Sequence, residues 1–352
     1  MLIINSNNFL TSSHLACTRE GFQWKSELSD ANVFAEEFPE LAAIFGKKID
    51  PLIPDYYANS AKQLNIKPPW CFYIGKQKYL NMVEKYKDQY FDFIDDYNEK
   101  LISIHAKINY FLRKLQPCVF NNSLIDSDLS VHFQKSLQAH YNNGVISVPK
   151  YIRTKTKTGR LSVLSGPNVL NMHAGLRKGV VDGVSIDFVS MEPNFLLAYQ
   201  GREPLTNLYE TVREELFENK ISRAKVKIAT MAALYGSGRS DKLANKISEF
   251  FSLDQMINTL ENKIKNDTIK NAYDRLLNLN GARGRYLLAL WLQSSAADGA
   301  LYGFYNFDKN YQIIPYWIIH DGLIFIYKGK PENINELDVG LGFKLPVKVE
   351  KL

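Results

Sequence analysis

The sequence predicts an α+β fold, and three observations point to that class. Apolar residues recur in steps of three and four over 90–115, which indicates a long helix. A short β-type run at 184–186 ends on Asp187. The segment IIHDGLIFIY (318–327) contains two apolar runs joined through an Asp-Gly pair, which is a strong signal for an antiparallel hairpin. Helices and antiparallel strands are therefore expected in one chain.

The composition is that of a globular chain with a moderate positive charge. Its 352 residues are enough for two or three domains, and a hydrophobic content of 45% is enough for a sizeable core. The net charge of +6 is compatible with a nucleic-acid partner, but many other proteins match it. Most of the 20 Tyr and 20 Phe residues are expected in the core, and stacking on bases is the alternative role for some of them.

Cysteine usage and the lack of targeting signals indicate the compartment. Cys17, Cys71 and Cys118 are isolated, so neither a zinc site nor a disulfide framework is expected. The N-terminal residues lack the basic start and apolar core of a signal peptide. No run of about 18 apolar residues indicates a membrane span. We therefore expect a cytoplasmic protein without membrane association.

The apolar stripe over 90–115 predicts one continuous helix that packs on a partner helix. Pro117 is expected to end it. The stripe comprises Tyr90, Ile94, Tyr97, Leu101, Ile104, Ile108, Phe111 and Leu115.

The run YIRTKTKTGR (151–160) contains basic residues and no acidic one. Its alternation with threonine is typical of an exposed strand or loop. A solvated surface and contact with phosphate groups both explain the charges. The basic residues are Arg153, Lys155, Lys157 and Arg160.

Two acidic residues lie at the ends of strand-like segments. Asp187 is either a metal ligand at a strand end or a cap for the helix that follows. Asp321 is either a turn residue or the holder of a positive group, because a buried unpaired carboxylate is costly. Gly322 would make a tight turn easy.

A helix is predicted that begins with Ser222 as its cap and ends at Gly236 and Gly238. Two cations followed by an apolar and an aromatic residue would suit a triphosphate and a base. An ordinary amphipathic helix with a basic end is the alternative. The four residues lie at a spacing of four and share one face: Arg223, Lys227, Met231 and Tyr235.

Five segments, in this order, resemble the signatures of family A DNA polymerases, the DNA polymerase I class. Together they lie within 141–330, and the order makes the match more specific than any one segment. The segments are TGRLSVLSGPNVLNM (158–172), SIDFVSMEPN (185–194), RAKVKIATMAALYG (223–236), LQSSAAD (292–298) and IHDG (319–322).

The resemblance implies a polymerase right hand with an antiparallel-sheet palm, helical fingers and a helical thumb, in a compact form without a proofreading exonuclease. Residues 1–75 have no assigned role, and 76–150 would form the thumb-like region. Residues 151–222 and 283–352 would form the two parts of the palm, and 223–282 the fingers.

The same resemblance implies two-metal phosphoryl transfer. Asp187 and Asp321 match the catalytic carboxylates that hold two Mg²⁺ ions, with Mn²⁺ as the alternative, and the carbonyl of Phe188 matches a further ligand. Lys227 matches the residue that also protonates pyrophosphate.

The nucleotide and DNA contacts are implied residue by residue. Arg223 and Lys227 match cations that bind the incoming deoxynucleoside triphosphate. Tyr235 matches the residue beside the templating base, and Glu192 the residue that blocks a ribose 2′-hydroxyl. Primer–template DNA contacts are matched by Arg160, Asn168, Arg285, Gln293 and His320.

The sequence departs from the family pattern at three site positions, and the mildest change is Phe188 in place of a tyrosine. Gly322 stands where a glutamate is usual, which removes one carboxylate near the metals. Met231 stands where an aromatic residue usually stacks on the nucleotide. The latter two substitutions bear on activity.

Two other functions compete with a DNA polymerase. A single-subunit RNA polymerase or primase relative would share the palm, but Glu192 argues against it. A non-catalytic nucleic-acid-binding protein with the same fold would be compatible with Gly322, but the Asp187 and Asp321 pair argues against it. A helicase, a primase or a clamp are candidate accessory partners.

Overall fold

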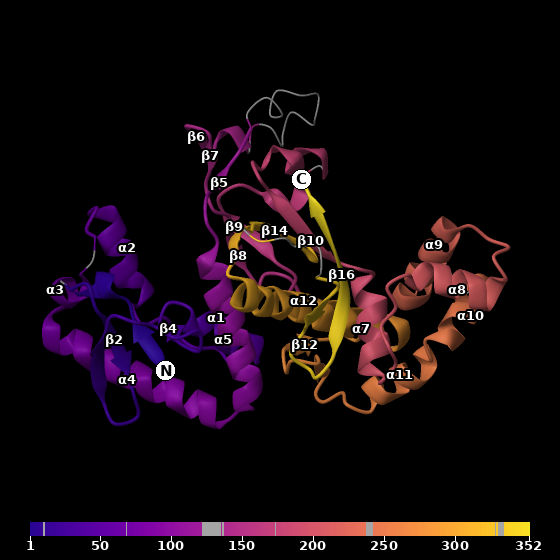
Figure 1. Cartoon of the computed structure of the whole chain (residues 1–352). Coiled ribbons are helices and arrows are strands. Elements are labelled where there is room, and N and C mark those ends of the chain that lie inside the picture. Colours follow the sequence, from indigo (N-terminus) through magenta and orange to yellow (C-terminus); the bar gives the residue numbers. More distant parts are fainter. Residues whose placement is uncertain are drawn as a thin grey trace. The chain divides into compact units, whose positions relative to one another are not determined.

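The computed structural model divides the chain into two compact units, Met1–Arg113 and Lys114–Leu352, called unit 1 and unit 2 here (Figure 1). Among the described residues, no helix is long and apolar enough to cross a membrane. The structure describes residues 1–9, 11–67, 69–121, 135, 137–172, 174–236, 242–327, 329 and 334–352.

Unit 1 combines a four-stranded sheet with helices. The strand order is β3-β2-β1-β4, in which β1 runs parallel to β4 and antiparallel to β2. The elements are β1 (Leu2–Ile4), η1 (Ser6–Asn8), β2 (His14–Cys17), β3 (Phe22–Lys25), β4 (Val33–Phe34), α1 (Phe38–Ile44), α2 (Asp55–Gln63), α3 (Trp70–Ile74), α4 (Lys76–Asp95) and α5 (Glu99–Lys114).

The core of unit 1 joins its strands to α4. The ring of Phe38 on α1 meets those of Tyr86, Tyr90 and Phe93 on α4 edge to face, with centroids 5.4, 5.3 and 5.5 Å away. All four side chains belong to one buried cluster that also includes Leu2 of β1. Residues on both sides of the expected boundary at 75 therefore share one core.

The prediction of one continuous helix over 90–115 is wrong, because two helices cover that range. α4 ends at Asp95 and α5 begins at Glu99. The side chain of Asn98 accepts a hydrogen bond from the Lys100 amide at 3.0 Å, which is the geometry of a helix N-cap. The cap interrupts the helix although the apolar spacing continues through it.

Unit 2 contains a five-stranded antiparallel sheet and several helices. Its elements are β5 (Cys118–Val119), β6 (Tyr141–Asn142), β7 (Val145–Ile146), β8 (Lys150–Ile152), β9 (Ser162–Ser165), η3 (Val169–Asn171), η4 (Ala174–Gly179), β10 (Val184–Phe188), α7 (Met191–Tyr199), α8 (Leu208–Phe217), α9 (Arg223–Tyr235), α10 (Lys242–Phe250), α11 (Leu253–Glu261), β11 (Thr268–Lys270), β12 (Leu276–Asn278), α12 (Gly284–Tyr311), β13 (Ile314–Ile319), β14 (Gly322–Ile326), β15 (Glu336–Asp338) and β16 (Lys344–Lys351).

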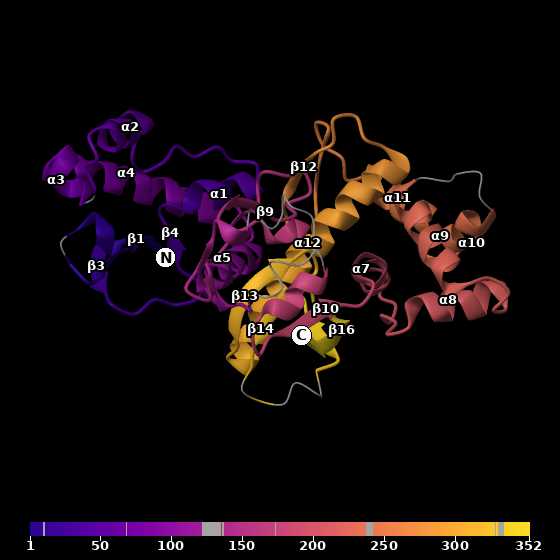
Figure 2. The same cartoon turned by 90° about the horizontal axis from the view of Figure 1, so that it is seen from above.

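The large sheet of unit 2 has the order β13-β14-β10-β16-β15, with α12 against one face (Figure 2). The rings of Phe304 on α12 and Phe188 on β10 lie 5.5 Å apart, and those of Phe307 and Phe325 lie 5.0 Å apart. Because side chains alternate along a strand, Phe188 faces α12 and Asp187 faces the opposite side of the sheet.

The structure confirms the strand before Asp187, the β13–β14 hairpin and the helix from Ser222. The Ser222 hydroxyl accepts a hydrogen bond from the Lys225 amide at 3.3 Å, and Gly236 ends α9 with φ +78°. The other glycine expected at this end, Gly238, lies outside the described residues.

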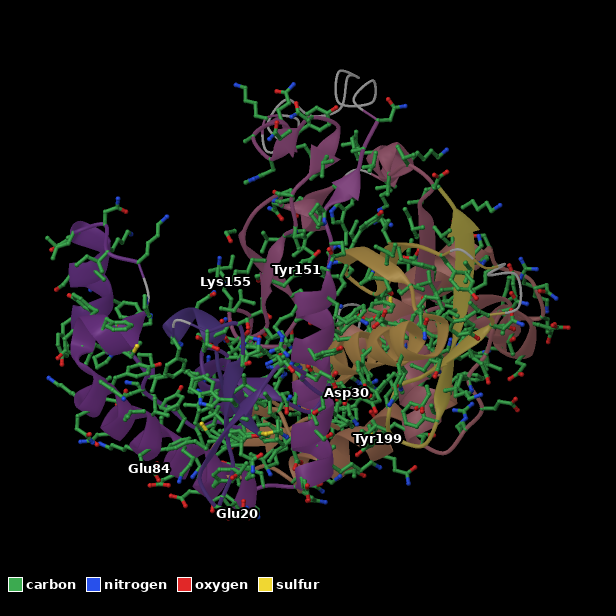
Figure 3. All side chains as sticks on the ribbon, turned by 60° about the vertical axis from the view of Figure 1, so that its left-hand side comes forward. Glu20, Asp30, Glu84, Tyr151, Lys155 and Tyr199 are labelled. Atoms are coloured by element: carbon green, nitrogen blue, oxygen red, sulfur yellow. The ribbon has the colours of Figure 1, made fainter. Side chains whose placement is uncertain are left out.

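The basic run 151–160 is not uniformly exposed, which corrects the expectation from its alternation. Lys155 and Lys157 are exposed (Lys155 is labelled in Figure 3), but Arg153 is fully buried. Its guanidinium donates to Asp298 on α12 at 2.9 Å. A basic side chain in a strand-like segment is expected to be solvated, except where a buried acidic residue pairs with it, as Asp298 pairs with Arg153.

Asp298 lies at the centre of a buried polar cluster. Arg275 donates to both of its carboxylate oxygens, at 2.9 and 2.8 Å, and Asn271 donates to it at 2.9 Å. Neither Asp298 nor Arg153 is exposed, and Arg275 is 4% exposed. This carboxylate therefore joins α12, the loop after β11 and the segment after β8.

We expect Asp298→Asn to lower the free energy of unfolding by about 3–5 kcal/mol, because it leaves two buried guanidinium groups without a counter-charge. Urea denaturation followed by circular dichroism measures the change. Glu336→Gln is the matched control, since its ion pair with Lys344 is more than half exposed. Equal denaturation midpoints for the two variants would contradict the assignment.

Candidate active site

The pairing of β10 with β14 brings Asp187 and Asp321 together from distant parts of the sequence. Asp187 lies opposite Gly322 in the strand register, next to Asp321 at the hairpin turn. The amide of Phe188 donates to the carbonyl of Asp321 at 3.1 Å. The backbone therefore fixes the two residues beside one another.

The surroundings of both carboxylates disfavour their charged forms. Burial raises the pKa of Asp321, and the negative charges of Glu192 and Asp187 raise it further, against a backbone hydrogen bond and His320. Burial also raises the pKa of Asp187, although Arg177 and Lys348 act in the opposite direction. A cation between the carboxylates would stabilise both charges.

The two carboxylates are compatible with Mg²⁺. Within the described ranges, no group of three or more His, Cys, Asp and Glu side chains could hold a metal ion by protein ligands alone. Mg²⁺ usually needs only one or two carboxylates, because substrate phosphates and water complete its shell. The oxygen donors of Asp187 and Asp321 suit this hard cation, and the Phe188 carbonyl as a further ligand stays a prediction.

Gly322 has a different role from the one its sequence suggests. The interpretation that it eases the turn is wrong, because His320 carries the left-handed conformation, with φ +56°, and Gly322 begins β14. A Cβ at residue 322 would lie 2.2 Å from Oδ1 of Asp187. The glycine therefore leaves room for the Asp187 carboxylate.

Glu192, at the start of α7, bonds residues from two other segments. It forms an ion pair with Arg160 and accepts a hydrogen bond from the Tyr235 hydroxyl at 3.2 Å. Gln293 on α12 also hydrogen-bonds Tyr235. Burial, together with the charge of Glu192, raises the pKa of Tyr235 to about 12. This network joins α7, α9, α12 and the loop after β8.

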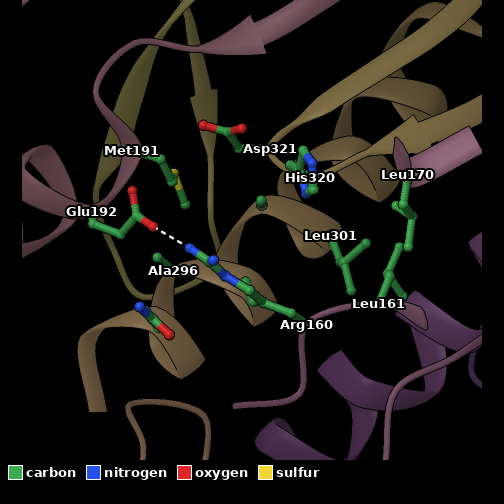
Figure 4. Close-up of a pocket in the computed structure, with 12 residues that line it drawn as sticks. Arg160, Leu161, Leu170, Met191, Glu192, Ala296, Leu301, His320 and Asp321 are labelled. Atoms are coloured by element: carbon green, nitrogen blue, oxygen red, sulfur yellow. Dashed lines mark hydrogen bonds and ion pairs between the residues drawn. The ribbon is translucent and has the colours of Figure 1, made fainter. Parts of the chain in front are cut away.

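A pocket of about 300 Å³ lies beside this network (Figure 4). One side is polar and acidic, and the small residues of α12 form another side. Asp321 and Glu192 lie on its wall, so the pocket opens next to the paired carboxylates. Its lining residues are Arg160, Leu161, Leu170, Met191, Glu192, Gln293, Ala296, Ala297, Ala300, Leu301, His320 and Asp321.

On helix α9, the residues spaced four apart share one face, as predicted, and none of them is buried. Arg223 and Lys227 are exposed, and Met231 and Tyr235 are half-buried. Arg223 lies 3.6 Å from Glu210 and 5.4 Å from the ring centre of Tyr209. The buried residues fall on the other side of the helix: Val226, Ala229, Thr230, Ala233 and Leu234.

Two of the predicted DNA contacts lie outside the pocket lining. Asn168 is exposed before η3, and the guanidinium of Arg285 faces α10 and α11. Arg285 donates to Asp254 at 2.7 Å and also to Ser248. In this structure Arg285 therefore holds helices together, whereas His320 and Gln293 line the pocket.

The sequence does not indicate the packing of Arg275 against Gly159, which supports the neighbouring Arg160. Gly159 has φ +73°, and a Cβ there would lie 2.5 Å from the guanidinium of Arg275. Arg275 in turn donates to the carbonyl of Arg153 at 3.3 Å. In LQSSAAD, an aspartate among small residues indicates a buried ion pair at Asp298. Its partners, Arg153 and Arg275, lie in other segments and cannot be identified from this stretch.

Comparisons with known proteins find a distant similarity among solved structures. No family model and no curated protein matches the chain. A solved structure described as the POL domain of Pol1 from M. smegmatis in complex with DNA primer-template and dNTP is similar at a TM-score of 0.44 and 15% identity. The match covers 90% of this chain and 62% of that chain, so this chain spans less than two thirds of its length.

We expect Gly159→Ala to lower the free energy of unfolding by about 2 kcal/mol or more, because it combines a left-handed backbone with a contact against Arg275. Gly342→Ala is the matched control, since Gly342 has φ +88° with open space around its Cβ position. Urea denaturation of both variants separates backbone strain from the contact. A cost at Gly159 no larger than that at Gly342 would contradict this packing.

Proposed function

We propose that this chain is a template-directed DNA polymerase, which adds deoxynucleotides to a primer 3′ end by two-metal phosphoryl transfer. The observation that carries the proposal is the placement of Asp187 on β10 beside Asp321 in the β13–β14 turn, next to a pocket lined by Arg160, Glu192 and Gln293. The fingers and palm of the resemblance then correspond to the α9 region and the large sheet. Region 76–150 as a thumb remains part of the proposal.

In the proposed reaction, Asp187 and Asp321 would hold two Mg²⁺ ions, with Mn²⁺ as a substitute, and the Phe188 carbonyl would be a further ligand. Bound there, the ions would activate the primer 3′-hydroxyl and neutralise the charge of the leaving pyrophosphate. Gly322 leaves one carboxylate fewer than the family pattern. The open space that it provides lets Asp187 lie against β14.

The exposed face of α9 is the proposed site for the incoming nucleotide. Arg223 and Lys227 supply positive charge for the triphosphate, and Lys227 donates a proton to pyrophosphate. Met231 and Tyr235 border the base. These assignments agree with the exposure of the two cations and with the position of Tyr235 at the pocket network.

The pocket side chains are proposed to contact the primer–template duplex. Arg160 and Gln293 present donors that suit minor-groove acceptors common to all base pairs. His320, which lines the pocket, is proposed to border the primer terminus. Asn168 and Arg285 are retained as DNA contacts, and for Arg285 this requires release from Asp254.

The first test is primer extension with Mg²⁺ and deoxynucleotides. We expect extension by the wild type and a rate at least about 1,000-fold lower for Asp321→Ala, a barrier increase of about 4 kcal/mol. Glu336→Gln, on the exposed edge strand β15, is the control and should extend like the wild type.

Equal rates for wild type and Asp321→Ala would overturn the mechanism. No extension by the wild type would favour a non-catalytic nucleic-acid-binding protein. A mismatched primer incubated without nucleotides should keep its length, and shortening would contradict the proposed lack of proofreading.

The second test concerns the choice of sugar. We expect Glu192→Ala to reduce the preference for deoxynucleotides over ribonucleotides about 10–200-fold, because the carboxylate beside Tyr235 is proposed to exclude a 2′-hydroxyl. Competitive incorporation of both nucleotide types measures the ratio. Tyr235→Phe controls for loss of the hydrogen bond alone. A wild type that prefers ribonucleotides would indicate an RNA polymerase instead.

A further inference from the structure

Unit 1 exposes aromatic rings on α2 and α3, far in sequence from the candidate active site. Tyr56 on α2 is 60% exposed and Phe72 on α3 is 68% exposed. Leu64, in the loop between the two helices, is 67% exposed. Large apolar side chains gathered in one exposed segment are a sign of a binding surface.

Ring contacts hold this segment together. The ring centres of Tyr57 and Tyr73 lie 6.0 Å apart, which joins α2 to α3, and Trp70 lies 5.8 Å from Tyr73. Tyr56 lies 4.2 Å from Tyr57. Tyr56 precedes Tyr57 in the sequence, and Phe72 precedes Tyr73. The contact between Tyr57 and Tyr73 therefore holds the backbone beside both exposed rings.

The same segment also carries exposed lysines. Lys62, Lys67, Lys76 and Lys78 are all exposed, and Asp55 is the acidic residue between positions 55 and 80. The amino group of Lys78 donates to the Tyr57 hydroxyl at 2.6 Å and lies 5.2 Å from that ring. The segment is thus positive as well as aromatic.

We propose that this surface, formed by Tyr56, Tyr57, Lys62, Lys67, Phe72 and Lys78 and called the aromatic–lysine surface, binds single-stranded nucleic acid. Bases stack on the rings of Tyr56 and Phe72, and the lysines contact the phosphates. Single strands are favoured over a duplex because stacking needs unpaired bases. They are favoured over a protein partner because lysine is depleted at protein–protein interfaces.

The test measures binding of the full-length chain to a fluorescent oligothymidine of about 12 nucleotides, a usual site size for single strands. We expect Tyr56→Ala combined with Phe72→Ala to weaken binding at least about fivefold. Phe72→Trp keeps a stacking ring and should bind like the wild type. Trp24→Ala is the matched control, because Trp24 is 55% exposed on β3 outside this surface.

The lysines are tested through salt dependence. Lys62→Ala combined with Lys67→Ala should reduce the slope of log affinity against log salt by about 0.7 for each lysine. Thermal unfolding of every variant confirms that the fold is retained. A wild type that binds no oligothymidine, or an aromatic double variant that binds as tightly as Trp24→Ala, would overturn the proposal.

Binding at the aromatic–lysine surface and the proposed polymerase activity are tested by separate measurements. Primer extension on a short duplex should be unchanged by Tyr56→Ala combined with Phe72→Ala, since neither residue belongs to the active site. Loss of oligothymidine binding with retained extension supports the surface as a second site. Extension that disappears together with binding would show that the surface is part of the active site and would overturn its independence.

Discussion

The buried carboxylate of Asp298 connects the parts of unit 2 that carry the candidate active site. Arg153 and Arg275 both donate to it, and a fully buried acid can be retained only with such partners. Through them it joins α12, which carries Gln293, to the segment that ends in Arg160. The position of Arg160 against Glu192 therefore depends on an ion-pair cluster that has no direct contact with the proposed substrate.

The large sheet supplies the second constraint, which is the fixed distance between two acids. β10 and β14 are adjacent, so their register places Asp187 beside the hairpin turn that contains Asp321. Phe188 packs on α12 from the other face and holds β10 in place. The sheet thus holds two carboxylates side by side, and burial raises the pKa of both.

The predictions from sequence succeeded where chemistry and local periodicity coincided. The strand before Asp187, the hairpin and α9 with its exposed cations follow from short stretches in which spacing and caps agree. They failed where a distant partner decided the outcome. Arg153 belongs to a run that favours exposure, but Asp298 pairs with it in the core, and Asn98 caps a helix within a continuous apolar stripe.

The sequence by itself determined the α+β class, the two acids at strand ends and the basic and aromatic face of α9, because each depends on neighbours within a few residues. Only the tertiary structure decided that Glu192 joins Arg160 to Tyr235, and that Gly322 makes room for Asp187 and is not the turn residue. Those outcomes depend on strand register and on contacts between segments far apart in the chain, and folding alone brings these segments together.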